Sequence, residues 1–197
     1  MKRNSFLLTT LVTLCVLVSC QRNHDPDLTV HGVDADGLPL DPAQVERGSY
    51  LVTVMLCNDC HSPKMMEGQS ILPDPKRLLS GHPAGEVLPA IADSSILQDY
   101  VLFSMGFTAA VGPWGTSYAA NLTPDQTGLG NWTYEHFETA LRHGKFKGMM
   151  SGRSLLPPMP WEMFQHLNDQ DMRAIWSYLQ SLPPVQNVVP PPVMPIS

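Results

Sequence analysis

Two cysteines and a histidine stand close enough together in the sequence to act on one bound group. They form the segment Cys57-Asn58-Asp59-Cys60-His61. C-x-x-C followed directly by His is the attachment pattern of c-type haem. Two thiols at this spacing can add to the two vinyl groups of one porphyrin, and the next residue can then offer its imidazole to the iron. The pattern predicts one covalent haem c, attached through Cys57 and Cys60, with His61 as an axial iron ligand.

The C-x-x-C spacing has two other common uses. A thioredoxin-like redox pair is expected inside a βαβ pattern, and the sequence around Cys57 shows none. A zinc site usually needs a second ligand pair, and after residue 20 the chain holds no cysteine besides Cys57 and Cys60. An N-terminal export signal and a Met-Pro element downstream both favour haem. The remaining alternative is a non-haem module in which the two thiols form a redox disulfide.

The first residues have the features of a lipoprotein signal peptide, spanning 1–19. Lys2 and Arg3 are followed by a short apolar run that ends in Leu-Val-Ser-Cys at Cys20, which resembles the bacterial lipobox. In such a signal Cys20 is acylated and becomes the mature N-terminus. The alternatives are an ordinary secretory signal and an uncleaved anchor, for which the apolar run is short. We expect a lipid-anchored, periplasm-facing protein of the bacterial cell envelope.

Charge and composition narrow the class of protein further. The formal charge is −6 over 197 residues, and it becomes −8 when Lys2 and Arg3 leave with the signal. An acidic chain argues against nucleic acid as a partner and would suit a positively charged redox protein, although an acidic solvated surface explains it equally well. With 19 prolines and 14 glycines, much of the chain is expected to be loop.

Three helices are predicted from apolar periodicity and capping residues. The first begins at Asp41 and has an apolar face that includes Gly48, which suggests that another helix crosses closely there. The second covers 131–143, and the third begins near Asn168 and stops before a Pro-Pro pair. Prolines and glycines interrupt residues 62–130, where we expect loops over the haem edge and a short helix around 94–105.

Met159 is the predicted second iron ligand. It lies between Pro158 and Pro160, and flanking prolines hold a loop rigid, so that even the weak thioether donor can bind iron. The opposing interpretation is that Met159 packs in the core, as most methionines do. The rival ligands are Met149, Met150, His143 and His166. The remaining histidines have no motif around them and are expected at the surface; they are His24, His31 and His82.

Several blocks of the sequence, taken together, resemble one family. These are YAANLTPD at 118–125, TGLGNW at 127–132, the Pro-Met-Pro element at 158–160, and an acidic helix start with a closing Pro-Pro-Val in 169–185. They are similar to the haem modules of the cytochrome c subunits of membrane-bound alcohol and gluconate dehydrogenases. The resemblance covers most of residues 44–185 and implies their fold, haem and ligands. Those subunits carry several haem modules, whereas this chain has one haem motif.

The resemblance also implies which residues border the haem. In such modules the segment before the Asn-Leu-Thr-Pro-Asp block lies beside the haem. Trp114, Tyr118 and Asn121 are therefore expected as possible propionate contacts, and Arg153 could pair with a propionate. Each of the four has an equally plausible role as a turn or packing residue.

The expected fold class is all-α. We expect a cytochrome c-like small helical domain wrapped around one haem, with a long loop-rich insertion between the haem motif and the methionine ligand. The expected organisation is a signal peptide at 1–19, a flexible tether at 20–40, the cytochrome c domain at 41–184 and a proline-rich tail at 185–197.

A haem iron with His and Met in its two axial positions has no open position for a substrate. The expected function is therefore electron transfer rather than catalysis. The expected donor is a dehydrogenase or a quinol-oxidising complex, and the expected acceptor is an oxidase or another cytochrome. The alternative is a haem enzyme or gas-binding sensor with an open sixth position, although no cluster of catalytic bases lies beside the motif.

Overall fold

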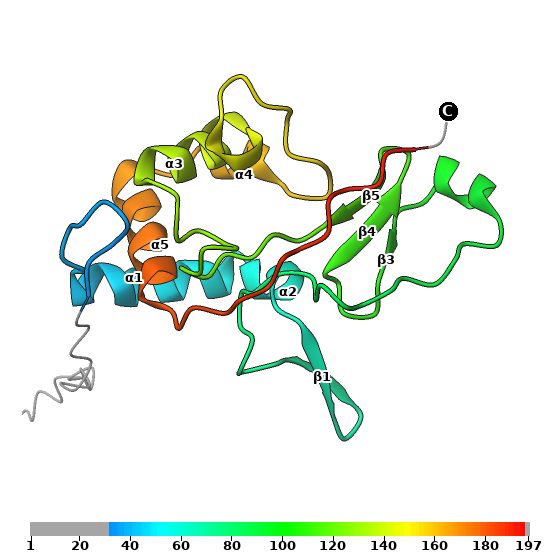
Figure 1. Cartoon of the computed structure of the whole chain (residues 1–197), viewed down its shortest axis with the longest axis horizontal. Helices are drawn as coiled ribbons and strands as arrows, with labels where there is room; N and C mark the ends of the chain where they lie inside the picture. Colours follow the sequence, from blue (N-terminus) through cyan, green and yellow to red (C-terminus); the bar gives the residue numbers. More distant parts are fainter. Residues whose placement is uncertain (1–31, 196–197) are drawn as a thin grey trace, which may run out of the picture.

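The computed structural model describes residues 32–195 (Figure 1). The predicted signal peptide, Cys20, His24 and His31 lie outside the described residues. Helix α1 (Pro42–Val54) leads into the short helix that carries the haem motif, and the last helix, α5 (Asp169–Ser181), crosses α1 (Figure 1). No helix within the described range is both long enough and apolar enough to span a bilayer.

The crossing of α1 (Pro42–Val54) and α5 (Asp169–Ser181) is the centre of the fold. Both helices begin where the sequence predicts, with the side chains of Asp41 and Asn168 accepting hydrogen bonds from backbone N–H groups of the first turn. A Cβ at Gly48 would lie 2.6 Å from the carbonyl carbon of Ala174. Only glycine permits so close an approach, which confirms the predicted helix crossing.

Helix α3 (Tyr134–His143) packs beside this pair. Thr133 and His136 form a capping box at its start, and Gly144 ends it in the left-handed conformation with φ of +60°. The three helices enclose one apolar core, whose buried members include Leu51, Val52, Leu79, Leu129, Phe137, Met172, Ile175, Trp176 and Leu179.

Residues 32–40 fold back against α5. Asp34 is only 7% exposed, and its Oδ2 accepts a hydrogen bond of 3.2 Å from the indole Nε1 of Trp176. A bridge between Val33 and Pro39 closes the turn. The described part of the segment expected to be a flexible tether therefore packs on the domain.

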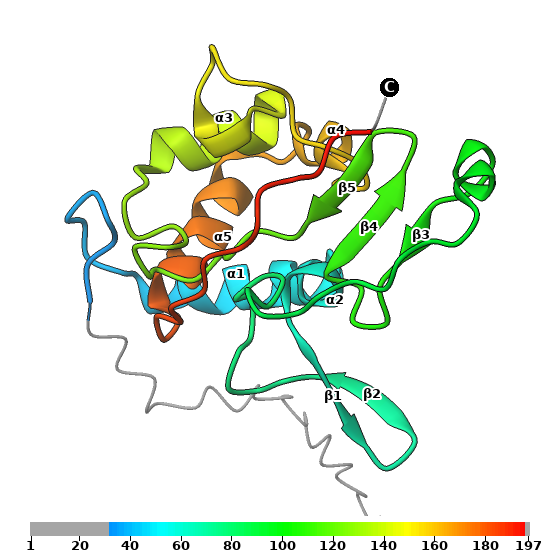
Figure 2. The same ribbon diagram turned by 45° about the vertical axis from the view of Figure 1, so that its right-hand side comes forward.

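Along the chain, two antiparallel sheets separate the haem motif from α3, and the first of them projects away from the helices (Figure 2). The first is a protruding hairpin of β1 (Lys64–Glu67) and β2 (Ser70–Pro73). The second contains β3 (Leu102–Phe103), β4 (Ala109–Gly112) and β5 (Gly115–Tyr118), paired in that order.

The prediction of an all-α fold is therefore wrong, because the chain combines helices with two small sheets. The error has a physical reason. Strands of two to four residues are too short to show the alternation by which a strand is recognised. The glycines of this region also serve the hairpins: Gly68 lies in the turn between β1 and β2 with φ of +61°, and Gly115 begins β5 with φ of +95°.

Four short elements complete the chain. They are α2 (Cys57–His61), the 3-10 helices η1 (Ser94–Gln98) and η2 (Phe146–Gly148), and α4 (Trp161–Phe164). Only the first part of the helix predicted around 94–105 is helical, because β3 begins at Leu102.

The C-terminal segment runs from α5 across to β5 (Figures 1 and 2). Val193 and Thr116 exchange backbone hydrogen bonds of 2.7 and 3.0 Å. Asn187 donates its side-chain amide to the carbonyl oxygens of Ser80 and His82, at 2.7 and 2.8 Å. The proline-rich end of the chain thus ties α5, the segment around residue 82 and β5 together.

Candidate haem site

Helix α2 places the two cysteines one turn apart on the same face. Both thiols are partly buried and free of disulfides. Burial raises the pKa of Cys57 to about 11 and also raises the pKa of Cys60 above its ordinary value. A redox-active dithiol normally has a lowered thiol pKa, so this environment disfavours the redox-disulfide alternative. Within residues 32–195 no three His, Cys, Asp or Glu side chains gather into a metal-binding group, as the zinc alternative would require.

His61 is held in the form that binds iron. Its Nδ1 lies 2.8 Å from the carbonyl oxygen of Ala120. Because a carbonyl oxygen only accepts, Nδ1 must carry the proton, and Nε2 keeps its lone pair for a metal. Burial lowers the pKa of His61 below its ordinary value, partly offset by this hydrogen bond, and so favours the neutral imidazole. Two free thiols and a metal-ready imidazole on one helix fit a c-type haem.

Two residues that sequence reasoning missed hold α2 in place. Ser62 is fully buried, donates to the side chain of Asn58 at 2.9 Å and accepts from the backbone N–H of Leu79 at 2.8 Å. Lys64 donates its Nζ to the carbonyl oxygens of residues 58, 59 and 62, at 3.1, 2.7 and 2.7 Å. A lysine just beyond a helix end is the local signal that could have indicated this cap.

Met159 stands two residues before α4, and α4 lies on the side of the domain opposite to α2 (Figures 1 and 2). The residue is partly buried and lines a groove of about 190 Å³ together with Leu155 and Trp161. A ligand that meets the iron across from His61 would have to come from this side of the domain.

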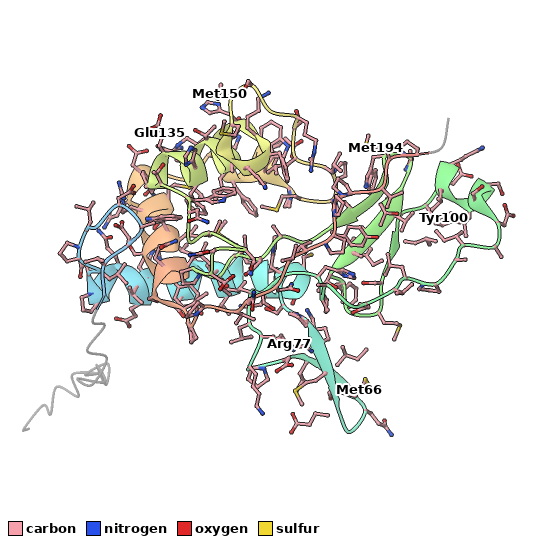
Figure 3. All side chains as sticks on the ribbon, viewed as in Figure 1. Met66, Arg77, Tyr100, Glu135, Met150 and Met194 are labelled. Atoms are coloured by element: carbon pink, nitrogen blue, oxygen red, sulfur yellow. The ribbon has the colours of Figure 1, made fainter. Side chains whose placement is uncertain are left out.

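The rival ligands are less well placed. Met149 and Met150 are 51% and 62% exposed, and Figure 3 shows Met150 at the outer edge of the loop between α3 and α4. His143 and His166 are also exposed. The arrangement favours Met159 among the predicted ligands.

Ser117 on β5 positions the methionine segment and was not singled out by the sequence. Its hydroxyl donates to the carbonyl oxygen of Pro157 at 2.6 Å and accepts from Nε1 of Trp114 at 3.3 Å. Trp114 therefore contacts the same hydroxyl whose hydrogen bond to Pro157 joins β5 to the methionine segment. Its predicted haem contact stays a prediction.

The other predicted haem contacts lie in different surroundings. All hydrogen-bonding atoms of the buried Asn121 amide are engaged within the protein, by Thr123, Thr127 and the carbonyl of Val185. Arg153 is exposed and stacks its guanidinium 3.8 Å from the centre of the Phe146 ring. A propionate contact by either residue would have to replace or add to these interactions, and it stays a prediction.

The expectation that His82 lies at the surface is wrong. Its side chain is fully buried, its Nδ1 lies 2.9 Å from the hydroxyl of Thr108, and its ring centre lies 4.7 Å from that of Tyr118. Burial lowers the pKa of His82, against a smaller raising effect of Glu86. Sequence reasoning missed this residue because the two side chains that its ring contacts, those of Thr108 and Tyr118, are distant from it in the chain.

A cysteine pair and histidine on one short helix, and a proline-held methionine across the domain, are the parts of a c-type cytochrome haem module. No family model matches the chain. Comparison with curated proteins finds the gluconate 2-dehydrogenase cytochrome c subunit of Pantoea cypripedii, 31% identical over 137 residues, which are 69% of this chain and 22% of that protein.

Two further relatives are cytochrome subunits. The fructose dehydrogenase cytochrome subunit of Gluconobacter japonicus is 38% identical over 80 residues, covering 40% of this chain and 16% of that protein. The cytochrome c subunit of the quinone alcohol dehydrogenase of Gluconobacter oxydans is 40% identical over 89 residues, covering 43% and 18%. The chain spans less than a quarter of each of these relatives.

The chain is thus a homologue of the cytochrome c subunits of gluconate, fructose and alcohol dehydrogenases. The resemblance seen in the sequence to the haem modules of such subunits is confirmed.

Proposed function

We propose that this chain is a membrane-tethered monohaem cytochrome c that carries single electrons between redox partners on the periplasmic side of the bacterial envelope. The observation that carries the proposal is the hydrogen bond of 2.8 Å between His61 Nδ1 and Ala120, on a helix that also presents both motif cysteines. When bound, the haem supplies a reversible one-electron iron couple.

Four side chains and one backbone carbonyl would bind the haem and orient its iron ligand. Cys57 and Cys60 would hold the porphyrin covalently, and His61 and Met159 would bind the iron. The Ala120 carbonyl keeps the proton on Nδ1 of His61, which fixes the orientation and basicity of the ring. An iron bound by both residues would have no open position for a substrate, as expected of an electron carrier rather than an enzyme.

The proposed partners follow from the relatives. Their names describe cytochrome subunits of sugar-acid, sugar and alcohol dehydrogenases. We therefore propose a dehydrogenase or a quinol-oxidising complex as the donor, and an oxidase or another cytochrome as the acceptor. The net charge of −8 without the signal supports a basic docking surface on at least one partner.

Optical spectra and a redox titration of the purified protein test this function. We expect a low-spin haem spectrum in both oxidation states, a one-electron midpoint and no rapid binding of carbon monoxide at neutral pH, because both axial positions are filled. Rapid binding of carbon monoxide by the wild-type protein would support the gas sensor or haem enzyme instead. A colourless protein, correctly matured and exported, would support the non-haem redox module.

The proposed lipid anchor has its own test. Cys20→Ala should abolish incorporation of labelled fatty acid and release the protein from membranes, while haem staining of the exported protein is unchanged. The reason is that Cys20 lies in the predicted lipobox and outside the haem motif. The matched control is Cys15→Ala, which removes a cysteine from the predicted signal without touching the lipobox. Unlabelled, soluble wild-type protein would leave only an ordinary secretory signal.

A further inference from the structure

His82 is a buried polar residue to which the proposed electron transfer assigns no role. Its side chain is fully buried, and its Nε2 has no hydrogen-bond partner among the residues that the structure describes. A buried polar atom without a partner costs free energy, so such a histidine needs a compensating reason to be there. Its Nδ1 lies 2.9 Å from the hydroxyl of Thr108. The backbone and the carboxylate of Glu86 also interact with the ring, and against the lowering effect of burial both act to raise the pKa of His82.

The surroundings of His82 connect it to the proposed iron ligand. Its backbone N–H donates to the carbonyl oxygen of Ala119 at 2.9 Å, and its ring packs against Tyr118. The next carbonyl in that segment belongs to Ala120 and accepts from Nδ1 of His61. His82 therefore contacts the segment of residues 118–120 through both its backbone and its ring.

Two backbone hydrogen bonds and one close backbone approach link the residues around His61, Gly81 and Ala119. The N–H of Gly81 donates to the carbonyl oxygen of His61 at 2.7 Å, and the backbone of residue 81 is so close to residues 119–121 that a Cβ would lie 2.6 Å from the carbonyl oxygen of Ala119. The N–H of Ala119 donates to the carbonyl oxygen of Thr108 at 2.9 Å. Thr108 thus braces the His82 ring with its hydroxyl and residue 119 with its backbone.

We propose that His82 is a positioning residue for the iron ligand His61, because it fixes the direction of the Ala120 carbonyl and thereby sets the reduction potential of the bound haem. The inference rests on the proposed function, since it takes His61 as the ligand. A well-aligned hydrogen bond at Nδ1 makes the imidazole a stronger donor and stabilises ferric iron. Loss of the alignment should therefore raise the midpoint potential.

Four single variants and one double variant test the proposal by redox titration of the full holoprotein. His82→Phe keeps an aromatic ring at this position but removes its hydrogen bond. Thr108→Val removes the hydroxyl partner with little change in shape. Both should raise the midpoint potential, and the double variant should shift it no further than the larger single shift, because the two residues act through one contact. His82→Asn can keep a polar atom near the position of Nδ1 and should restore much of the wild-type potential.

The fourth variant, Val45→Ala, controls for a general loss of stability. Val45 is buried in the first turn of α1, at the end of that helix remote from the haem motif. Its replacement by alanine should therefore leave the midpoint potential unchanged. Wild-type potentials in both His82→Phe and Thr108→Val would overturn the proposal, as would an equal shift in Val45→Ala. If His82→Phe does not fold, Thr108→Val decides alone. A wild-type protein without a one-electron couple would instead overturn the proposed function.

Discussion

Replacing Cys57 and Cys60 together by alanine is expected to give a protein without bound haem. The two side chains lie on one face of α2, and each would form a thioether to the porphyrin. Thioethers survive denaturation, whereas a haem held only by axial ligands does not. The wild-type protein should therefore stain for haem on a denaturing gel, and the double variant should show complete loss of the stain.

The matched control for this experiment is Cys20→Ala, which removes a cysteine that lies outside the haem motif. It should keep the stain wherever export still occurs, because haem attachment does not depend on the lipid. Haem that acidic organic solvent extracts freely from the wild-type protein would refute covalent attachment through Cys57 and Cys60.

The second large effect is expected at Met159. Met159→Ala should abolish the sulfur-to-iron charge-transfer band of the oxidised protein and allow carbon monoxide to bind the reduced iron, because the sixth position becomes open or is filled by water. The midpoint potential should fall, since a thioether stabilises ferrous iron more than water does. Spectra of both oxidation states, carbon monoxide binding and a redox titration measure the three changes.

Met149→Ala and Met150→Ala provide matched controls. Both methionines are exposed in the segment between α3 and α4, where Figure 3 shows Met150. Neither substitution should therefore change the spectrum, the potential or carbon monoxide binding. Substitutions at the exposed His143 and His166 should also leave these three properties unchanged. A wild-type spectrum in Met159→Ala would show that Met159 is not the sixth ligand.

The Met159 and His82 variants are expected to shift the midpoint potential in opposite directions, which separates the role of the methionine ligand from that of the contacts behind His61. Loss of Met159 should lower the potential, whereas loss of the His82 contact should raise it while leaving the charge-transfer band in place. A change in both the band and the potential in His82→Phe would indicate that the whole haem environment had moved.

The parts of this protein that could be predicted from sequence depend on local interactions. The haem motif is recognisable because covalent geometry requires two intervening residues and an adjacent histidine. The helix starts at Asp41 and Asn168 and the stop at Gly144 are recognisable because capping involves groups within four residues of one another. The close helix crossing was also predictable, because a glycine within an apolar helix face costs stability unless another backbone lies against it.

The tertiary structure alone decided the features that depend on distant partners. The sheets between residues 64 and 118 are built from strands too short to have a pattern, so their pairing comes from neighbours brought together by the fold. The burial of His82 depends on Thr108 and Tyr118, which lie 26 and 36 residues further along the chain. The carbonyl that orients His61 belongs to Ala120, 59 residues away. A backbone carbonyl is the same in every residue, so no sequence signal marks the one that holds the iron ligand.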